Sequence, residues 1–179
     1  MLLLFDAPRT PWRVSSSSDP RALAVVDGTG RFDGAGPHYS RRSPGSRTFT
    51  GVGREIVLLT TCGRAVWSVV LQKTPAKKGT GNSRGRDGTA DPAVRYVWRN
   101  NMFRNLGAGL SSDLITAATG ETYRYWILAY GELPNCRLRT EIDPTKIRST
   151  NPGYCYRVAG WQPDTARRRG GKVFLYAPA

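Results

Sequence analysis

A glycine-rich stretch follows the strand-like segment 95–103, and its backbone could bind an anion. Residues 104–109 read Arg-Asn-Leu-Gly-Ala-Gly, and Ser111 or Ser112 can cap the helix that follows. Free N–H groups at a helix N-terminus can hold a pyrophosphate, and glycines let the backbone approach it closely. The candidate cofactor-binding residues are Arg104, Asn105, Gly107, Ala108, Gly109, Ser111 and Ser112. The alternative is a strand-to-helix turn that binds nothing.

The chain contains one histidine, His38, within the glycine- and proline-rich stretch 28–53. Tyr39 follows it directly, and Arg41 and Arg42 come shortly after. Because an imidazole changes charge near neutral pH, His38 is a candidate substrate-side residue or, less favoured, a metal ligand. The alternative is an ordinary surface histidine in a loop.

The charge balance favours a polyanionic partner. Lys and Arg number 27 against 13 Asp and Glu, a net charge of +14, and neutralising phosphates with such residues releases counterions. Residues 73–92 contain almost nothing that can be buried, so we expect a flexible basic loop insertion there. Its Lys77, Lys78, Arg84 and Arg86 could lie along a phosphate backbone. The alternatives are a generally basic surface and a solvated insertion without function.

Several classes of protein are disfavoured. The three cysteines, Cys62, Cys136 and Cys155, form no Cys-x-x-Cys pair, so neither a zinc site nor a disulfide framework is indicated. The zinc signature of base deaminases is missing for the same reason. The apolar start is too short for a signal peptide and no stretch reaches membrane-spanning length. We expect a soluble, unexported, cytoplasmic protein without a membrane partner.

The pattern of apolar residues predicts a sheet that ends at the glycine-rich stretch. The first 20 residues indicate an edge strand leading into a loop, and residues 21–27 fit either a buried strand or a short helix. Residues 54–61 and 65–72 form the clearest antiparallel hairpin. Residues 95–103 alternate like a strand.

The second half of the chain predicts helices that alternate with short strands. A helix runs from Ser111 or Ser112 to Gly131, and a strand covers 137–142. Asn151 and Pro152 suit the N-cap and first position of a two-turn helix that Gly160 stops. A last strand covers 172–176. The chain, residues 1–179, forms one domain on this interpretation.

Two motifs carry a resemblance to known proteins. The loop after a fourth strand and the element order from about residue 22 resemble the GNAT acetyltransferase fold, a mixed, mostly antiparallel α/β (α+β) sheet flanked by helices. Asp143-Pro144, followed by the pattern Gly-x-x-Tyr-Arg-x-x-Gly-Trp at 153–161, is similar to the Mom-type DNA-modification family of phages, a divergent branch of that fold. The resemblance covers roughly residues 36–177. The interval after Asp143-Pro144 and the insertion at 73–92 depart from the family pattern.

The resemblance implies functional residues. It gives Tyr156 and Asp143 the positions of a functional tyrosine and aspartate, and it adds His38 as a third catalytic candidate. It implies an acetyl-CoA or related acyl-CoA donor, a possible iron requirement, and duplex DNA as partner. The candidate nucleic-acid-binding residues are Tyr39, Arg41, Arg42, Lys77, Lys78, Arg84, Arg86, Arg148 and Arg157.

The chemistry of those residue types suits a transfer reaction. A phenol can protonate a departing thiolate, and a carboxylate can take a proton from an exocyclic amine. The alternative is structural: Tyr156 packs a helix and Asp143 shapes a turn.

Three functions follow. The first is a transferase that modifies a base, by resemblance the adenine exocyclic amine, in phage DNA to evade restriction. The second is an acyl-CoA-dependent N-acetyltransferase acting on a protein lysine or small amine. The third is a non-enzymatic nucleic-acid-binding protein on a degenerate fold.

Overall fold

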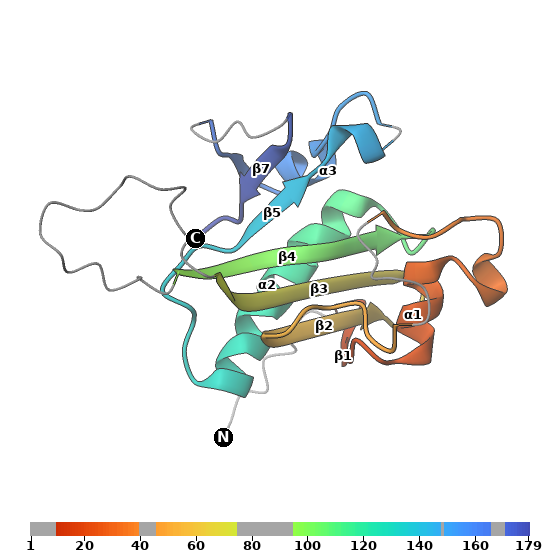
Figure 1. Ribbon diagram of the computed structural model, residues 1–179, viewed down its shortest axis with the longest axis horizontal. Coiled ribbons are helices and arrows are strands. Elements are labelled where there is room, and N and C mark those ends of the chain that lie inside the picture. Colours follow the sequence, from red (N-terminus) through yellow and green to blue (C-terminus); the bar gives the residue numbers. More distant parts are fainter. Residues whose placement is uncertain (1–9, 40–45, 75–94, 148, 166–170) are drawn as a thin grey trace, which may run out of the picture.

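The computed structural model describes residues 10–39, 46–74, 95–147, 149–165 and 171–179. They form a seven-stranded sheet in the order β1-β2-β3-β4-β5-β7-β6, with helices on both faces (Figure 1). All neighbouring strands are antiparallel except β4 and β5, which are parallel. The predicted mixed, mostly antiparallel sheet flanked by helices is therefore confirmed. None of the helices in the described ranges has the length and apolar content that crossing a bilayer requires.

The first half of the chain builds one edge of the sheet. β1 (Trp12–Ser15) pairs with β2 (Arg54–Thr60), and β2 forms the predicted hairpin with β3 (Ala65–Thr74). Between β1 and β2 lie α1 (Pro20–Asp27) and a short 3-10 helix, η1 (Gly30–Phe32). The pattern of apolar residues in 21–27 fitted either a strand or a helix. Asp19 decides for the helix, because its side chain accepts a hydrogen bond from the Arg21 N–H and Pro20 follows at the first position.

The second half builds the other edge. β4 (Arg95–Asn105) leads through the glycine-rich loop to α2 (Ser111–Tyr130), and β5 (Arg139–Ile142) is followed by η2 (Pro144–Lys146). α3 (Tyr154–Val158) precedes β6 (Gln162–Pro163), which sequence reasoning missed, and β7 (Val173–Tyr176). Two predicted caps are wrong. Leu110 is the N-cap of α2 and makes no side-chain cap bond, and Gly153, with φ 76°, is the N-cap of α3.

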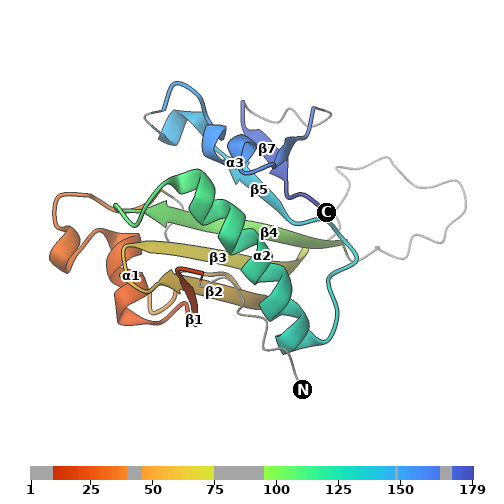
Figure 2. The same ribbon diagram turned by 180° about the vertical axis from the view of Figure 1, so that it is seen from behind.

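Each face of the sheet has its own core. α2 crosses one face (Figure 2) and covers a large cluster that includes three fully buried tryptophans, Trp67, Trp126 and Trp161. α1 covers the opposite face at one end, where Val25, Val57 and Met102 belong to a smaller cluster. The rest of this second face, over β3 to β5, has no helix on it in the described residues (Figure 1).

Candidate functional site

The site begins at a β-bulge in β4. The register between β3 and β4 shifts at Ser68 and Val69, which pair with Met102 and Asn100, so Asn101 is the extra residue of β4. A bulge re-aims the side chains that follow it. Before it, Asn100 faces the α2 side, where it contacts Tyr156. After it, Met102 belongs to the α1 side.

β4 and β5 separate at the same point. Their parallel pairing consists of Arg99 with Arg139 and Asn100 with Thr140, after which β5 turns away from β4 (Figure 1). The opening contains a cavity of about 310 Å³, which we call the β4–β5 cleft. Its wall residues are His38, Tyr39, Asn100, Asn101, Met102, Phe103, Thr140, Glu141, Ile142, Ile147, Ser149, Asn151, Gly153, Tyr154, Cys155 and Tyr156. Diverging strands thus create a cavity that reaches into the sheet.

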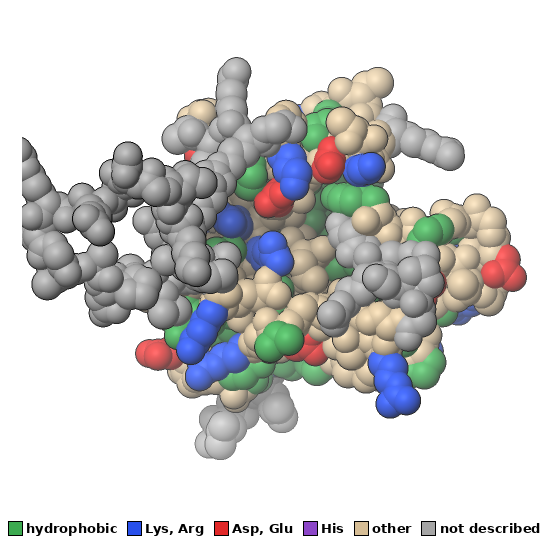
Figure 3. Space-filling view, in the orientation of Figure 1, with side chains coloured by type: hydrophobic (Ala, Val, Ile, Leu, Met, Phe, Trp, Pro, Cys, Tyr) green, Lys and Arg blue, Asp and Glu red, His purple; other side chains and the backbone are tan. Residues whose placement is uncertain are grey.

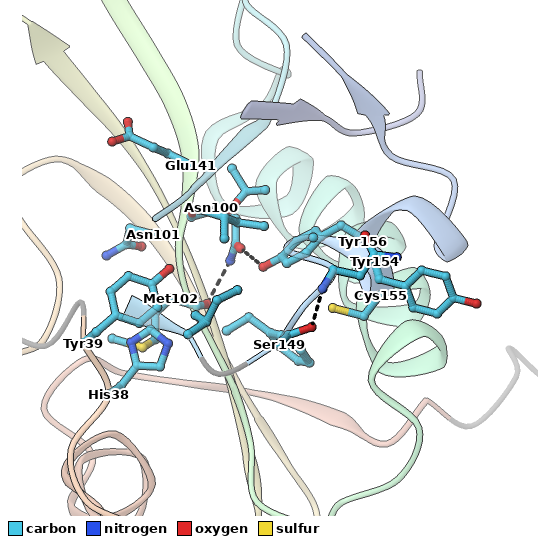
Figure 4. Close-up of a pocket in the computed structure, with 16 residues that line it drawn as sticks. His38, Tyr39, Asn100, Asn101, Met102, Glu141, Ser149, Tyr154, Cys155 and Tyr156 are labelled. Carbon is cyan, nitrogen blue, oxygen red and sulfur yellow. Dashed lines mark hydrogen bonds between the residues drawn. The ribbon is translucent and has the colours of Figure 1, made fainter. Parts of the chain in front are cut away.

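Tyr156 lines the cleft from α3 with its side chain buried. Its hydroxyl donates a hydrogen bond of 2.5 Å to the Asn100 Oδ1, as Figure 4 shows. The Asn100 amide is held in that orientation because its Nδ2 donates to the carbonyl oxygens of Ser68 and Met102. Burial raises the pKa of Tyr156 well above its usual value. The phenol is therefore protonated at neutral pH, and its proton points at Asn100.

Aromatic packing fixes the Tyr156 ring. Trp161 lies edge-on at a centroid distance of 5.1 Å, and Trp67 and Phe103 lie at 6.3 and 6.2 Å. The Trp161 and Trp67 indoles donate to the hydroxyls of Thr119 and Thr122 on α2. α2 thus positions the aromatic residues behind the cleft.

His38 and Tyr39 reach the cleft from the side opposite α3 (Figure 4). Their rings stack at 4.5 Å. Burial, with a smaller contribution from the Arg104 charge, lowers the pKa of His38 to about 4, although a hydrogen bond with the Phe103 backbone opposes this. His38 is therefore neutral at pH 7. Tyr39 is 40% exposed and offers an aromatic face beside it.

A second cavity of about 430 Å³, the charged cavity, adjoins the cleft on the face that α2 does not cover. Basic and acidic side chains gather on this face of the molecule (Figure 3). Four residues line both cavities: Tyr39, Asn100, Asn101 and Glu141. The charged cavity is also lined by Phe49, Gly51, Gln72, Arg99, Asp143, Lys146 and Lys172. The two spaces meet where β4 and β5 separate.

Asp143 and Glu141 occupy different positions relative to these cavities. Asp143 lines only the charged cavity, and its carboxylate accepts from the N–H and hydroxyl of Thr145, which lower its pKa. Glu141 lines both cavities and is ion-paired with Lys172. The structure therefore brings His38 and Tyr156 into one cavity, places Asp143 in the neighbouring one, and adds Glu141 between them.

The glycine-rich loop is held by Asn105. Its Oδ1 accepts from the N–H groups of Gly107 and Ala108, and its Nδ2 donates to the Gly109 carbonyl and the Ser111 hydroxyl. These contacts satisfy two of the N–H groups that were candidate anion ligands. The first turn of α2, which contains Ser111 and Ser112, begins without a side-chain cap, so its N–H groups are the part of this stretch that fits an anion.

Arg104 faces away from that helix terminus. It is 9% exposed, and its guanidinium donates to the carbonyl oxygens of Val26, Ala35 and Gly36 on the α1 side. The bulge at Asn101 explains this direction, because it reverses the face of each later residue of β4. Arg104 therefore joins β4 to the loop after α1, and its guanidinium points away from the cofactor site expected at the start of α2.

The predicted basic residues fall mostly outside the described ranges, namely Arg41, Arg42, Lys77, Lys78, Arg84, Arg86 and Arg148. Arg157 is described, is exposed, and contacts the side chain of Asn151 beside the cleft. Cys155 also lines the cleft, and burial raises the pKa of its thiol. Its thiol is therefore protonated at neutral pH.

No cluster of three His, Cys, Asp or Glu side chains that could hold a metal ion occurs in the ranges that the structure describes. The iron implied by the family resemblance has no ligand set among these residues. Comparisons with family models, with curated proteins and with solved structures found no match.

Asn100, Asn101 and Glu141 were missed by sequence reasoning. A pair of adjacent amides in a strand that otherwise alternates, residues 95–103, is the signal that could have pointed to the bulge. Nothing local marks Glu141, because its position depends on the pairing of β5 with both β4 and β7.

Proposed function

We propose that this protein is a two-substrate transferase that moves an acyl-type group from a donor in the β4–β5 cleft to a base amine of DNA in the charged cavity. In a phage-infected bacterial cytoplasm, the modification would protect phage DNA from restriction. One observation carries the proposal: the two cavities share Tyr39, Asn100, Asn101 and Glu141 at the point where β4 and β5 separate. A group-transfer reaction needs two such spaces with one common boundary.

The cleft suits the donor. An extended ligand between separating strands can use the backbone groups that their pairing leaves open, and α2 begins just after β4 with an uncapped first turn. Ser111 and Ser112 would hold the phosphates of an acyl-CoA, and the loop held by Asn105 would fix their position. When bound, an acyl-CoA supplies an acyl group activated as a thioester.

The charged cavity suits a nucleotide acceptor. Tyr39 offers a partly exposed ring on which a base can stack, and the Asn101 amide at the boundary carries donor and acceptor groups of the kind that read a base edge. Three basic side chains surround this position, and the +14 charge of the chain favours encounter with DNA. An extruded base fits this combination better than an apolar molecule does.

Glu141 and Tyr156 have separate roles in this scheme. Glu141, which lines both cavities, takes the proton of the attacking amine as the carbon–nitrogen bond forms and the carbon–sulfur bond breaks, and coenzyme A leaves as the thiolate, which takes a proton from solvent. Tyr156 donates a hydrogen bond to the Asn100 Oδ1 and keeps its proton, so its oxygen can accept a hydrogen bond from the amine and orient it. Loss of the Tyr156 proton would leave a phenolate facing the Asn100 oxygen, which disfavours the general-acid role expected from sequence.

Transfer to a lysine or small amine is the second candidate, because Glu141 and Asp143 in the charged cavity could attract a cationic amine. The purified protein is mixed with radiolabelled acetyl-CoA and either duplex DNA or a lysine-rich peptide. Label in DNA that is lost in Glu141→Gln supports base modification. Label in the peptide alone supports the second candidate, and label in neither contradicts an acetyl donor.

A further inference from the structure

The charged cavity contains a cation that its neighbours leave incompletely bonded. Arg99 projects from β4 into this cavity, and one terminal nitrogen of its guanidinium donates 2.5 Å to the Gln72 Oε1. Its Nε is buried and has no hydrogen-bond partner in the part of the chain that the structure describes. Burial lowers the pKa of Arg99, while the Glu141 charge opposes that effect. A buried N–H without a partner is costly, and it leaves the Arg99 guanidinium with part of its hydrogen-bonding capacity unused.

The floor of the cavity is built to hold Arg99 in place. A Cβ added at Gly51 would lie 2.2 Å from the Gln72 Nε2, so only a glycine lets that amide lie where it does. The same amide directs its oxygen to Arg99. Gly51 thus leaves room for the Gln72 amide, which accepts a hydrogen bond from the Arg99 guanidinium.

The charge of the cavity lining matches a single negative charge. Lys172 is ion-paired with Glu141, and the pKa of Asp143 is lowered by its bonds with Thr145 and further by Lys172 and Lys146. Among the residues that the structure describes, three basic and two acidic side chains line the space, an excess of one positive charge. A dianion would exceed that charge, and a neutral ligand would leave it uncompensated.

We propose that the charged cavity is a subsite for one phosphodiester, with Arg99 and Lys146 as its ligands, so that the base attached to this phosphate meets Asn101 and Glu141 at the cleft. This inference rests on the proposed function, and it names the acceptor as a nucleotide within a chain. A phosphodiester carries one negative charge and offers oxygen acceptors to a guanidinium. It thereby offers acceptors to the guanidinium that lines the cavity and balances the excess charge.

The test is a thermodynamic cycle in which one charged side chain of the protein and the charge of the ligand are removed, separately and together. The probes are a dinucleoside monophosphate containing deoxyadenosine and its methylphosphonate analogue, which lacks the charge, and each is titrated into the full-length protein by NMR. Lys146→Gln is the main variant, because Lys146 is exposed and its loss should not disturb folding. Arg13→Gln on β1, at the far edge of the sheet, is the matched control.

We expect the methylphosphonate to bind the wild type about tenfold more weakly, in line with a lost charge-assisted contact. Lys146→Gln should weaken the phosphodiester about tenfold and leave the methylphosphonate unchanged, while Arg13→Gln changes neither. Equal binding of the two probes to the wild type would overturn the proposal. So would equal weakening of both by Lys146→Gln.

A third arm identifies the source of the anion. Dimethyl phosphate must bind at least tenfold more weakly than the dinucleotide, because it lacks the base; equal affinity would make this a free-anion site and overturn the proposal. Base modification is measured separately in cells. If DNA in cells is modified but the two probes bind equally in the titration, the phosphodiester subsite is refuted and the transfer reaction is not. If binding depends on the ligand charge but DNA in cells is unmodified, the transfer reaction is refuted and the subsite is not.

Discussion

The β4–β5 cleft and the charged cavity share a boundary but differ in the charge state of the titratable side chains that line each of them alone. In the cleft, burial raises the pKa values of Tyr156 and Cys155 and lowers that of His38, so all three are neutral at pH 7. In the charged cavity, hydrogen bonds and neighbouring charges lower the pKa of Asp143 and raise that of Lys172, so both are charged. One space is organised by packing and the other by ion pairs.

The difference separates two tasks. A cleft lined by neutral, packed side chains suits a reacting group that must be held in a fixed geometry. A cavity lined by charged side chains suits an ionic ligand and tolerates changes in its side chains. The contrast predicts that substitutions on the cleft side lower stability strongly, whereas substitutions on the charged side alter binding. The following predictions run from the largest expected effect to the smallest.

Trp67→Ala should have the largest effect, because Trp67 is fully buried behind Tyr156 and donates to Thr122 on α2. Loss of a buried aromatic side chain costs about 3–5 kcal/mol. Denaturant unfolding monitored by circular dichroism measures this cost. A loss below about 1 kcal/mol would mean that packing does not organise the cleft.

His38 should make stability depend on pH. Its pKa is about 4 in the folded state and 6.5 as the ordinary value, so the unfolded state binds more protons between these values. The free energy of unfolding should therefore fall as pH decreases from 6.5 to 4, by at most about 3 kcal/mol, and level off below. The same titration of His38→Gln should be flatter in this window; identical curves would contradict the burial of a neutral imidazole.

Tyr156→Phe removes the donor to Asn100 without emptying the ring position. Because the Asn100 Oδ1 then lies buried without its donor, unfolding should become easier by about 1–3 kcal/mol. Tyr123→Phe is the matched control, since its hydroxyl donates to the Pro178 carbonyl in an exposed position, and its cost should be below about 1 kcal/mol. Equal costs for the two variants would contradict a buried hydrogen bond in which Asn100 orients the Tyr156 hydroxyl.

Lys146→Gln should have the smallest effect on stability, within about 0.5 kcal/mol of the wild type. Lys146 is exposed on η2 and lines only the charged cavity. Thermal unfolding checks this value. A loss above about 2 kcal/mol would show that the charged cavity is structural in the same way as the cleft.

Much of the fold could be predicted because it depends on local signals. The hairpin of β2 and β3, the strand β4 and the stop of α2 at Gly131 all follow from residues close to them in sequence. The caps of α2 and α3 could not be predicted in this way. Asn105 donates a hydrogen bond to the Ser111 hydroxyl, and a turn at Asn151 shifts the start of α3 to Tyr154.

The site was predictable only in part for a related reason. Tyr156 and His38 could be selected by residue type and motif, and both line the cleft. The direction of the Arg104 side chain could not be predicted, because one bulged residue, Asn101, reverses the alternation of side chains along β4. Glu141 lies at the boundary only because β5 pairs with a strand 40 residues earlier and then separates from it. Such long-range pairing leaves no local trace in the sequence.

The most direct test of the central claim is mass spectrometry of nucleosides from DNA of cells that express the protein. Two-substrate transfer to a base predicts a nucleoside of increased mass with the wild type, and at least a tenfold smaller amount with Glu141→Gln at equal protein level. RNA from the same cells serves as the parallel sample. Unmodified nucleosides in the DNA of wild-type cells, with folded protein present, would contradict the claim that the two cavities serve DNA base modification.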